Sequence, residues 1–439
     1  MNKKSITKQI NRAKEVQRSL EMSSLETRNH MLKLIMEALI ETMATIIEAN
    51  NKDIELAKSE NLSSVIVKRL IFNEDKIRAV VKGIGEVITL GDPLKGVKER
   101  RLLDEGLLLE KIPVSIGVIG MIFESRPDAL VQIISLALKS GNAIVLKGGK
   151  EALQTNTAVV KIIKEALQQT PVGGDWIVHL TSREDVSHIL TLNESIDLLI
   201  PRGSNQFVQY IMKHTSIPVL GHSDGLCAMY IDNEVDMDIA LSVAIDSKCQ
   251  YPSVCNAIET LLVHTDIAHQ FIPLFKTMSE PYKVIIHGDD ATTHLIEAVE
   301  ATDEDWDTEY LDYEIAIKVV SSMEEAIEHI TFHGSKHTDC IITTNNQKAN
   351  EFMRKVDSAD VFHNCSTRFA DGNRFGLGAE VGISTQKIHA RGPVGLDGLV
   401  TTKWLLRGNG HIVASYEKEK NYLHQNLDVQ GPSLAEDRS

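Results

Sequence analysis

The sequence has few of the residues that mark several common classes of protein. Its 439 residues include only five cysteines, at positions 227, 249, 255, 340 and 365, and none of them form a CxxC pair. A disulfide framework or a structural zinc site is therefore not expected, and a reducing, cytoplasmic environment fits best. Eleven prolines and 27 glycines are too few for a chain that is rich in linkers.

Long apolar runs and an excess of positive charge are also missing. The most apolar stretch, residues 116–123, is far too short to span a bilayer, and no apolar run follows the basic N-terminal residues. Neither a membrane span nor a secretory signal is expected. The net charge of −15 repels nucleic acid and anionic lipid, so neither is expected as a partner. A few lysines and arginines can still make a pocket locally positive.

The residues that are present indicate a globular α/β protein of two or three domains. Hydrophobic residues make up 43% of the chain and charged residues 24%. Apolar residues recur at helical spacing through residues 1–90, and two short apolar runs around Gly106 predict a hairpin. From residue 116 predicted strands and helices alternate, which indicates a parallel sheet with helices on its faces. A second α/β unit begins near Asp232.

Ligands of such sheets bind at the carboxyl ends of the strands, so the residues that follow each strand are candidate ligand contacts. They are residues 124–127, 147–149 and 201–204. The loop that begins at Lys147 has two glycines between a strand and a helix, which suits a nucleotide phosphate or ribose, although a solvated loop would have the same pattern. Neither a GxxxxGK[ST] nor a GxGxxG motif is present.

Two other stretches contain residues suited to chemistry. Cys255 lies between a proline-containing turn and an apolar strand, where a nucleophilic thiol can be partly exposed. A small buried hydrophobic residue is the alternative, and it is our interpretation of the other four cysteines. Residues 364–393 are dense in glycine, hydroxyl and basic side chains, as in an anion-binding loop system, although a solvated loop would have the same composition.

These stretches together carry a resemblance to a known family. The segments ESRPD, LKSGNAIVLKGGKEA, DLLIPRGSNQ, PVLGHSDG, VCNAIETLLVH, STRF and GAEVGISTQKIHARGPVGLDGL resemble those of the γ-glutamyl phosphate reductases (glutamate-5-semialdehyde dehydrogenases) of the aldehyde dehydrogenase superfamily. The likeness runs from the N-terminal helices to about residue 415. Tyr251 and Ser253 depart from the arginine and glycine that are common at these positions of the family.

The resemblance implies an aldehyde dehydrogenase-like α/β fold with three parts. Residues 1–99 and 115–232 would form a nucleotide-binding domain, and residues 233–398 a catalytic domain. Residues 100–114 and 399–413 would be oligomerisation strands, and residues 430–439 a disordered tail. An apolar edge strand invites aggregation unless it pairs with another subunit, so a homo-oligomer, either a dimer or a tetramer, is expected.

The resemblance also implies a reaction. It is the NADPH-dependent reduction of L-glutamyl 5-phosphate to L-glutamate 5-semialdehyde with release of phosphate, the second step of proline biosynthesis from glutamate. No metal is expected. A transient contact with glutamate 5-kinase is expected. The closest alternatives are an acyl-coenzyme A reductase and a hydrolytic aldehyde dehydrogenase, against which STRF and HARGP argue. A non-catalytic binding protein is a third, and the presence of Cys255 argues against it.

The resemblance assigns roles to individual residues. Cys255 would be the nucleophile, with its own backbone N–H and the Ser125 side chain as donors to the oxyanion. Lys150 stands where NAD-preferring relatives have a glutamate, and Gly221 where hydrolytic relatives have the glutamate that activates water. The expected substrate ligands are Arg126, Ser366, Thr367, Arg368 and Arg391. The expected cofactor ligands are Lys147, Gly149, Lys150, Gly203, Ser204 and Glu309.

Overall fold

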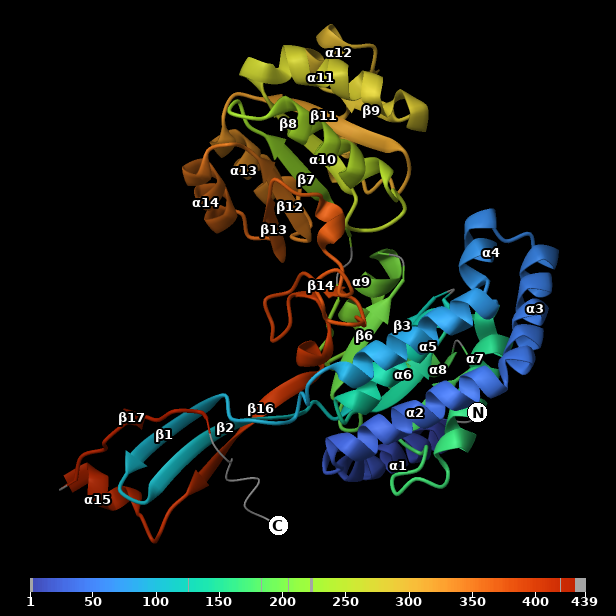
Figure 1. Cartoon of the computed structure of the whole chain (residues 1–439), viewed down its shortest axis with the longest axis vertical. Helices are drawn as coiled ribbons and strands as arrows, with labels where there is room; N and C mark the ends of the chain where they lie inside the picture. The colour runs from blue at the N-terminus through green and yellow to red at the C-terminus, as the bar shows by residue number, and fades with distance from the viewer. Residues whose placement is uncertain are drawn as a thin grey trace.

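The computed structural model describes residues 3–124, 126–182, 184–203, 205–221, 224–418 and 420–430. The chain forms two α/β parts, set one above the other, and a long arm that projects to one side (Figure 1). Ser125, Ser204 and all but the first residue of the predicted tail lie outside the described residues. None of the described helices is both long and apolar enough to cross a membrane.

The N-terminal residues form the expected helices. They are α1 (Lys3–Glu21), α2 (Leu25–Glu41), α3 (Met43–Ser59), α4 (Ser64–Leu70) and α5 (Glu74–Thr89). Two of these helices begin after a capping residue: Ser24 accepts a hydrogen bond from Thr27 N and Asn73 one from Lys76 N, both at 3.1 Å. The apolar faces of α1, α2 and α5 join the core of the first sheet.

The first sheet has four parallel strands in the order β5-β4-β3-β6. They are β3 (Val118–Phe123), β4 (Ala143–Lys147), β5 (Ile177–Leu180) and β6 (Leu198–Arg202). The helices between and after them are α6 (Pro127–Lys139), α7 (Leu153–Leu167), α8 (Glu184–Ile189) and α9 (Asn205–His214), with the short helix η1 (Lys150–Ala152) before α7. The strands are continuously apolar because helices cover both faces, and this confirms the predicted parallel sheet.

The order of the strands defines a binding crevice. From β3 the chain continues to β4 and β5 on one side, and then returns to place β6 on the other side of β3. Ligands of open α/β sheets bind at the carboxyl ends of the strands at such a reversal. Phe123 pairs with Arg202 and Ile122 with Lys147, so the residues that end β6 and β4 lie on either side of the end of β3.

The second sheet has seven strands in the order β10-β9-β11-β8-β7-β12-β13, and every pair of adjacent strands in it is parallel. The strands are β7 (Cys227–Ile231), β8 (Ile258–His264), β9 (Ile285–Gly288), β10 (Val299–Glu300), β11 (Glu314–Val320), β12 (Thr338–Ile342) and β13 (Asp360–His363). Their helices are α10 (Met237–Cys249), α11 (Thr265–Ser279), α12 (Asp290–Leu295), α13 (Met323–His333) and α14 (Asn346–Lys355), with η2 (Glu280–Tyr282), η3 (Asp303–Asp307) and η4 (Thr367–Phe369).

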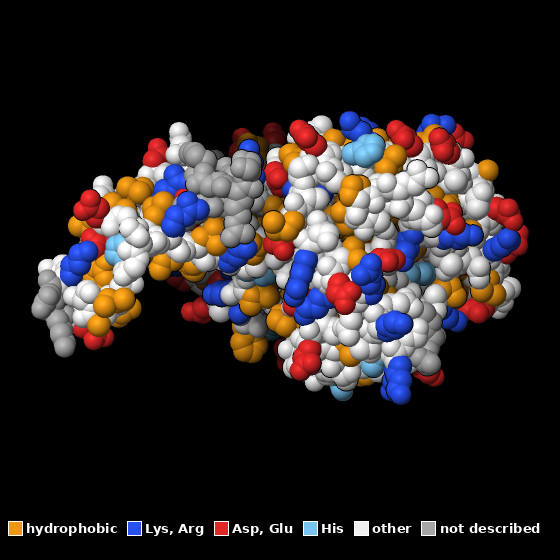
Figure 2. Space-filling model, turned by 90° about the horizontal axis from the view of Figure 1, so that it is seen from below, with side chains coloured by type: hydrophobic (Ala, Val, Ile, Leu, Met, Phe, Trp, Pro, Cys, Tyr) orange, Lys and Arg blue, Asp and Glu red, His pale blue; other side chains and the backbone are white. Residues whose placement is uncertain are grey.

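The projecting arm is an antiparallel sheet in the order β16-β2-β1-β17. It consists of β1 (Glu99–Asp104), β2 (Leu107–Ser115), β16 (Val400–Arg407) and β17 (Gln425–Asn426). The short helix α15 (Val413–Lys418) connects β16 to β17. Gly106 turns the predicted hairpin with a φ of +74°. Trp404 is 48% exposed and Leu406 58%, and hydrophobic side chains lie along the arm in Figure 2. Between the second sheet and the arm run β14 (Ile383–Ser384), β15 (Gly392–Pro393) and η5 (Leu396–Leu399).

Asn50 on α3 joins three segments of the first domain. Its side-chain amide donates to Leu70 O at 2.8 Å and to Thr155 Oγ1 at 3.2 Å, and its Oδ1 accepts from Phe72 N at 2.8 Å. Asn50→Ala would leave these buried backbone groups without their partner, and we expect it to cost about 2–3 kcal/mol of stability. Thermal unfolding and hydrogen exchange at the Phe72 amide measure this. The control is Asn51→Ala, because the neighbouring Asn51 is exposed. Equal effects of the two substitutions would contradict this account of Asn50.

Candidate active site

Cys255 lies in a turn between α10 and β8. The turn is closed by a hydrogen bond from Ala257 N to Val254 O at 3.0 Å. Cys227 Sγ donates to Cys255 O at 3.1 Å, and Asn256 Nδ2 donates to Ala370 O at 2.8 Å. The thiol itself is half-buried, whereas Cys227 is fully buried. The main chain of the turn is thus held from two sides while its sulfur stays accessible, as a nucleophilic cysteine requires.

The segment that joins the two domains passes directly against this turn. A Cβ built on Gly225 would lie 2.2 Å from Cys255 O and 2.5 Å from Cys255 Cα. No side chain fits at such distances, so glycine is required here for packing. The backbone that enters β7 and the backbone that carries the thiol are therefore in contact.

The STRF stretch is folded back to the same side of the sheet. Ser366 Oγ accepts from Arg368 N at 3.3 Å and lies 3.1 Å from Ser247 Oγ, which in turn accepts from Thr367 N at 3.2 Å. Arg368 Nε donates to Gln250 Oε1 at 3.0 Å. These contacts dock η4, with three predicted substrate ligands, on the end of α10, five to eight residues before Cys255.

Buried polar atoms without a partner accompany this stretch. Thr367 Oγ1 and Asn256 Oδ1 are buried, and neither has a hydrogen-bond partner among the described protein atoms. Buried polar groups nearly always have one, so the two atoms are available to a ligand or to water. Burial lowers the pKa of Arg368, and the negative charges that oppose this shift come from Asp371, Cys255 and Asp246.

Arg202 falls within residues 201–204, which follow a predicted strand, but no role was predicted for it. It ends β6 at the reversal of strand order, and it is half-buried. Burial lowers the pKa of its guanidinium, and the charges that act on it come from Glu380, Arg126, Cys255 and Asp128. The charges of Arg202 in the first domain and Arg368 in the second therefore both interact with the Cys255 thiol. Its position after a predicted strand was the signal that could have found it.

The loop of residues 380–393 closes over Arg202 but takes Arg391 elsewhere. Gly382 has a φ of +155°, and a Cβ built on it would lie 3.6 Å from Arg202 Nε. Arg391 donates from Nη1 to Asp357 Oδ1 and from Nη2 to Asp357 O, both at 2.9 Å. Asp357 precedes β13, which β7 and β12 separate from β8, a spacing of ~14 Å across the sheet. Arg391 is thus held against Asp357, near the start of β13.

The predicted ribose loop lies at the end of β4. Lys147 is buried, and burial lowers the pKa of its amine, while Glu151 and Asp185 oppose the shift. Glu151 folds over the loop, since a Cβ on Gly149 would lie 2.0 Å from Glu151 Oε1. Lys150 Nζ donates to Glu60 Oε2 at 2.9 Å on the surface. The loop therefore presents one buried and one exposed amine, with an acidic residue beside each.

The helix after this loop has no free N-terminus for a pyrophosphate. Asp53 of α3 accepts from Gln154 N at 3.1 Å and from Thr155 N at 2.8 Å, and so caps α7. The loop therefore suits the ribose end of a nucleotide better than its phosphates. The predicted pyrophosphate position, Gly203, follows β6, and a Cβ there would lie 3.0 Å from Glu124 Cδ.

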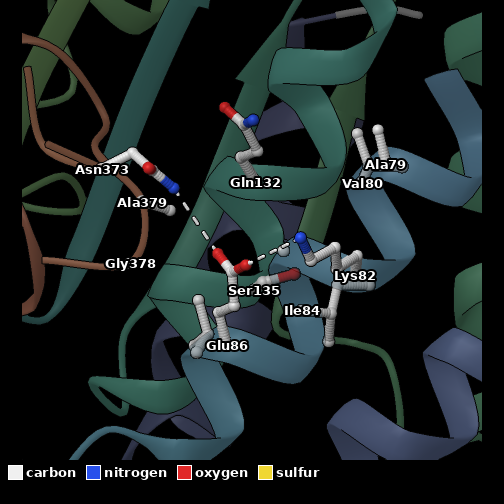
Figure 3. A pocket seen from close by; sticks show the side chains of 12 residues that line it. Ala79, Val80, Lys82, Ile84, Glu86, Gln132, Ser135, Asn373, Gly378 and Ala379 are labelled. Carbon is white, nitrogen blue, oxygen red and sulfur yellow. Dashed lines mark hydrogen bonds and ion pairs between the residues drawn. The ribbon is translucent and has the colours of Figure 1, made fainter. Parts of the chain in front are cut away.

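None of the predicted ligands among the described residues lines the cavity of about 250 Å³ that the structure contains elsewhere in the first domain. It is formed by α5, α6 and residues 373–379 (Figure 3). Glu86 lies at its side, 3.5 Å from Asn373 Nδ2 and 3.9 Å from Lys82 Nζ. Lys82 is the one cation among the described residues that line the cavity, and it faces Glu86.

Comparisons with known proteins agree with this arrangement. A model of the aldehyde dehydrogenase family matches residues 1–303. A γ-glutamyl phosphate reductase of Acetivibrio thermocellus is 50% identical over 429 residues, which cover 98% of this chain and 100% of that protein. One of Natronomonas pharaonis is 50% identical over 411 residues, 92% of this chain and 93% of that protein. The crystal structure of the γ-glutamyl phosphate reductase of Thermotoga maritima superposes with a TM-score of 0.91 at 39% identity, covering 93% of this chain and 99% of that one.

The contact between Gly225 and Cys255 can be tested without any substrate. Gly225→Ala would push the turn away, and we expect alkylation of Cys255 by iodoacetamide, followed by mass spectrometry, to change roughly tenfold in rate. Gly221→Ala is the matched control, because its Cβ would come no closer than 3.6 Å to Pro201. An unchanged rate in Gly225→Ala would show that the turn is not held by this contact.

Proposed function

Because the chain belongs to the aldehyde dehydrogenase family and, within it, to the γ-glutamyl phosphate reductases, we propose that its reaction proceeds through a thioester on Cys255. That reaction is the NADPH-dependent reduction of L-glutamyl 5-phosphate to L-glutamate 5-semialdehyde, a step of proline biosynthesis. The observation that supports Cys255 best is its half-buried thiol on a fixed turn, within electrostatic reach of one arginine from each domain.

The protein contributes a nucleophile and cations to the first step. The Cys255 thiolate attacks the acyl carbon, a C–S bond forms, and the C–O bond to phosphate breaks as phosphate leaves with the electron pair. The developing oxyanion accepts hydrogen bonds from the backbone N–H of Cys255 and, as the resemblance implies, from the Ser125 hydroxyl. Bound NADPH supplies the hydride that reduces the thioester. Collapse of the resulting thiohemiacetal frees the aldehyde and restores the thiolate.

The substrate carries a phosphate and an α-carboxylate, which need separate cations. We assign one anion to Arg368 with the hydroxyls of Ser366 and Thr367, and the phosphate to Arg126 and Arg202. Guanidinium groups suit both anions because their planar donors bind two oxygens at once and stay charged when buried. Arg391 already has Asp357 as a partner, so we leave it out of this set.

The residues expected to bind the cofactor can each be assigned to one part of NADPH. We assign Lys147 and Gly149 to the adenosine ribose, Lys150 to its 2′-phosphate, Gly203 and Ser204 to the pyrophosphate, and Glu309 to the nicotinamide ribose. Lys150 is exposed and its partner Glu60 is also on the surface, so a phosphate can replace that carboxylate at little cost. Ser204 lies outside the described residues.

Two wider proposals concern the setting of the enzyme. The exposed β16 edge, with Trp404 and Leu406, suits pairing with a second copy of the chain, as the predicted dimer or tetramer requires. The free cysteines fit the reducing cytoplasm. The transient contact with glutamate 5-kinase stays a prediction from the resemblance.

The reaction can be tested in reverse. Oxidation of glutamate semialdehyde by NADP should require added phosphate, because Gly221 stands where hydrolytic relatives carry the base that activates water. Cys255→Ala should lose more than about one-hundredfold in rate, or ~2.7 kcal/mol, with the fold intact. Fast formation of glutamate without phosphate would move the assignment to a hydrolytic aldehyde dehydrogenase. Activity in Cys255→Ala would mean that Cys255 is not the nucleophile.

The assignment of the arginines makes a paired prediction. Arg202→Gln should raise the KM for phosphate in this reverse reaction by roughly ten- to one-hundredfold, since a charge-assisted bond contributes ~1.5–3 kcal/mol. Arg391→Gln should change the same constant by less than about threefold, because its partner is Asp357. If Arg391 proved the more sensitive of the two, the phosphate site would have to be placed near β13.

A further inference from the structure

A fully buried ion pair lies beneath the turn that carries Cys255. Lys248, near the end of α10, lies 2.6 Å from Glu259, the second residue of β8, and their side chains are 0% and 1% exposed. Burial raises the pKa of Glu259 to about 7, and Lys248 opposes this shift. Buried ion pairs rarely add stability over apolar residues of similar size. The presence of this one therefore needs another reason.

The second oxygen of Glu259 suggests that reason. Glu259 Oε1 accepts a hydrogen bond from Leu311 N at 3.3 Å. Leu311 has a φ of +54°, in the left-handed region that costs a residue with a side chain ~1–2 kcal/mol. Its side chain is 40% exposed, so packing does not impose this conformation. The buried carboxylate holds the backbone of Leu311 in a conformation that it would not otherwise adopt.

The neighbouring residue is held by the other member of the pair and by a second anchor. Lys248 Nζ lies 6.0 Å from the centre of the Tyr310 ring, within the range of a cation–π contact. The Tyr310 hydroxyl donates to Asp305 Oδ1 at 2.8 Å, and its ring stacks on His287 at 5.1 Å. His287 bridges Asp305 and Glu314, at 3.1 Å each. Residues 305–311 are thus fixed at both ends.

Glu309 lies between these anchors. Burial is the main reason that the pKa of Glu259 is raised, and the charge of Glu309 adds to this shift, so Glu309 lies near the buried pair. The same pair is also close to the nucleophile in the sequence, since Cys255 is in the short connection between Lys248 and Glu259. A single buried contact therefore joins the turn that carries the thiol to the segment that carries Glu309.

We propose that Lys248 and Glu259 are positioning residues that set the nicotinamide half of the cofactor against the thioester on Cys255. The proposal rests on the proposed function, in which Glu309 contacts the nicotinamide ribose. Hydride transfer needs its two carbons in close and aligned contact, so a small shift of the 305–311 segment slows it strongly. The adenosine half is bound by the other domain and should not sense the pair.

The test replaces both charges at once, which leaves no buried charge without a partner. Lys248→Met with Glu259→Leu should keep the fold while it removes the acceptor for Leu311 N. We expect NADPH binding, followed by nucleotide fluorescence, to weaken roughly fivefold, and the first-turnover burst of NADPH from glutamate semialdehyde and NADP to slow roughly tenfold. Binding of 2′,5′-ADP, which has only the adenosine half, and alkylation of Cys255 should stay unchanged.

The matched control is Arg100→Met with Glu110→Leu. That pair is 2.6 Å apart and similarly buried, but it lies in the arm. Should the first double variant not fold, Leu311→Pro removes the same N–H and forbids the left-handed conformation from an exposed loop, whereas Leu311→Gly keeps both. Leu311→Pro should then reproduce the loss and Leu311→Gly should not.

Two results would overturn the proposal. Equal weakening of NADPH and 2′,5′-ADP would mean that the pair only supports the fold, and unchanged NADPH binding and burst rate would mean that it positions nothing. Failure of the proposed function is a separate result. Wild-type protein that binds NADPH but does not oxidise the semialdehyde in phosphate would disprove the reaction, while the two binding measurements would still decide the role of the pair.

Discussion

The candidate active site depends on one constraint: the main chain of the Cys255 turn is fixed while its thiol stays open. Gly225 packs against the turn with no room for a side chain, Cys227 donates to its carbonyl, and Asn256 bonds to Ala370. These contacts come from the interdomain segment, the neighbouring strand and the loop after η4. Because Gly225 lies on the segment that joins the two domains, the position of the thiol relative to the first sheet is set by backbone packing.

The charges around the thiol show why the total charge of a chain says little about its site. The protein carries −15 overall, yet Arg202 and Arg368 both lie within electrostatic reach of Cys255, and Arg126 acts on Arg202. Burial disfavours the charged form of each arginine, but a guanidinium titrates so far above neutral pH that it remains a cation. Burial also lowers the pKa of Lys147, and an amine titrates closer to neutral pH than a guanidinium does. Arginine is thus the residue that can place positive charge beside a half-buried sulfur.

Local patterns in the sequence predicted the fold well, and the limits of the prediction are also physical. The alternation of strands and helices depends on neighbours in the chain, so the parallel sheets and the hairpin at Gly106 could be predicted. The order of strands in a sheet depends on contacts between distant segments. Because β6 pairs with β3, Arg202 lies near the segment that carries Arg126. Because β13 is at the edge of the second sheet, Arg391 binds Asp357 there. Cys227 had the pattern of a core residue, and its bond to Cys255 crosses between strands.

The strand order of the first sheet also explains how one edge can serve two kinds of ligand. Lys147 ends β4 and Arg202 ends β6, and β3 separates them by two strand spacings, or ~10 Å. The helix after β4 is capped by Asp53, so the β4 side offers an amine and a glycine loop and no helix N-terminus for phosphate. The β6 side faces the second domain and its thiol. An extended dinucleotide that places its adenosine ribose at β4 therefore crosses the end of β3 and delivers its reactive end beside Arg202 and Cys255. In the proposed reaction, the reversal of strand order is what brings hydride donor, acyl phosphate and nucleophile to one point.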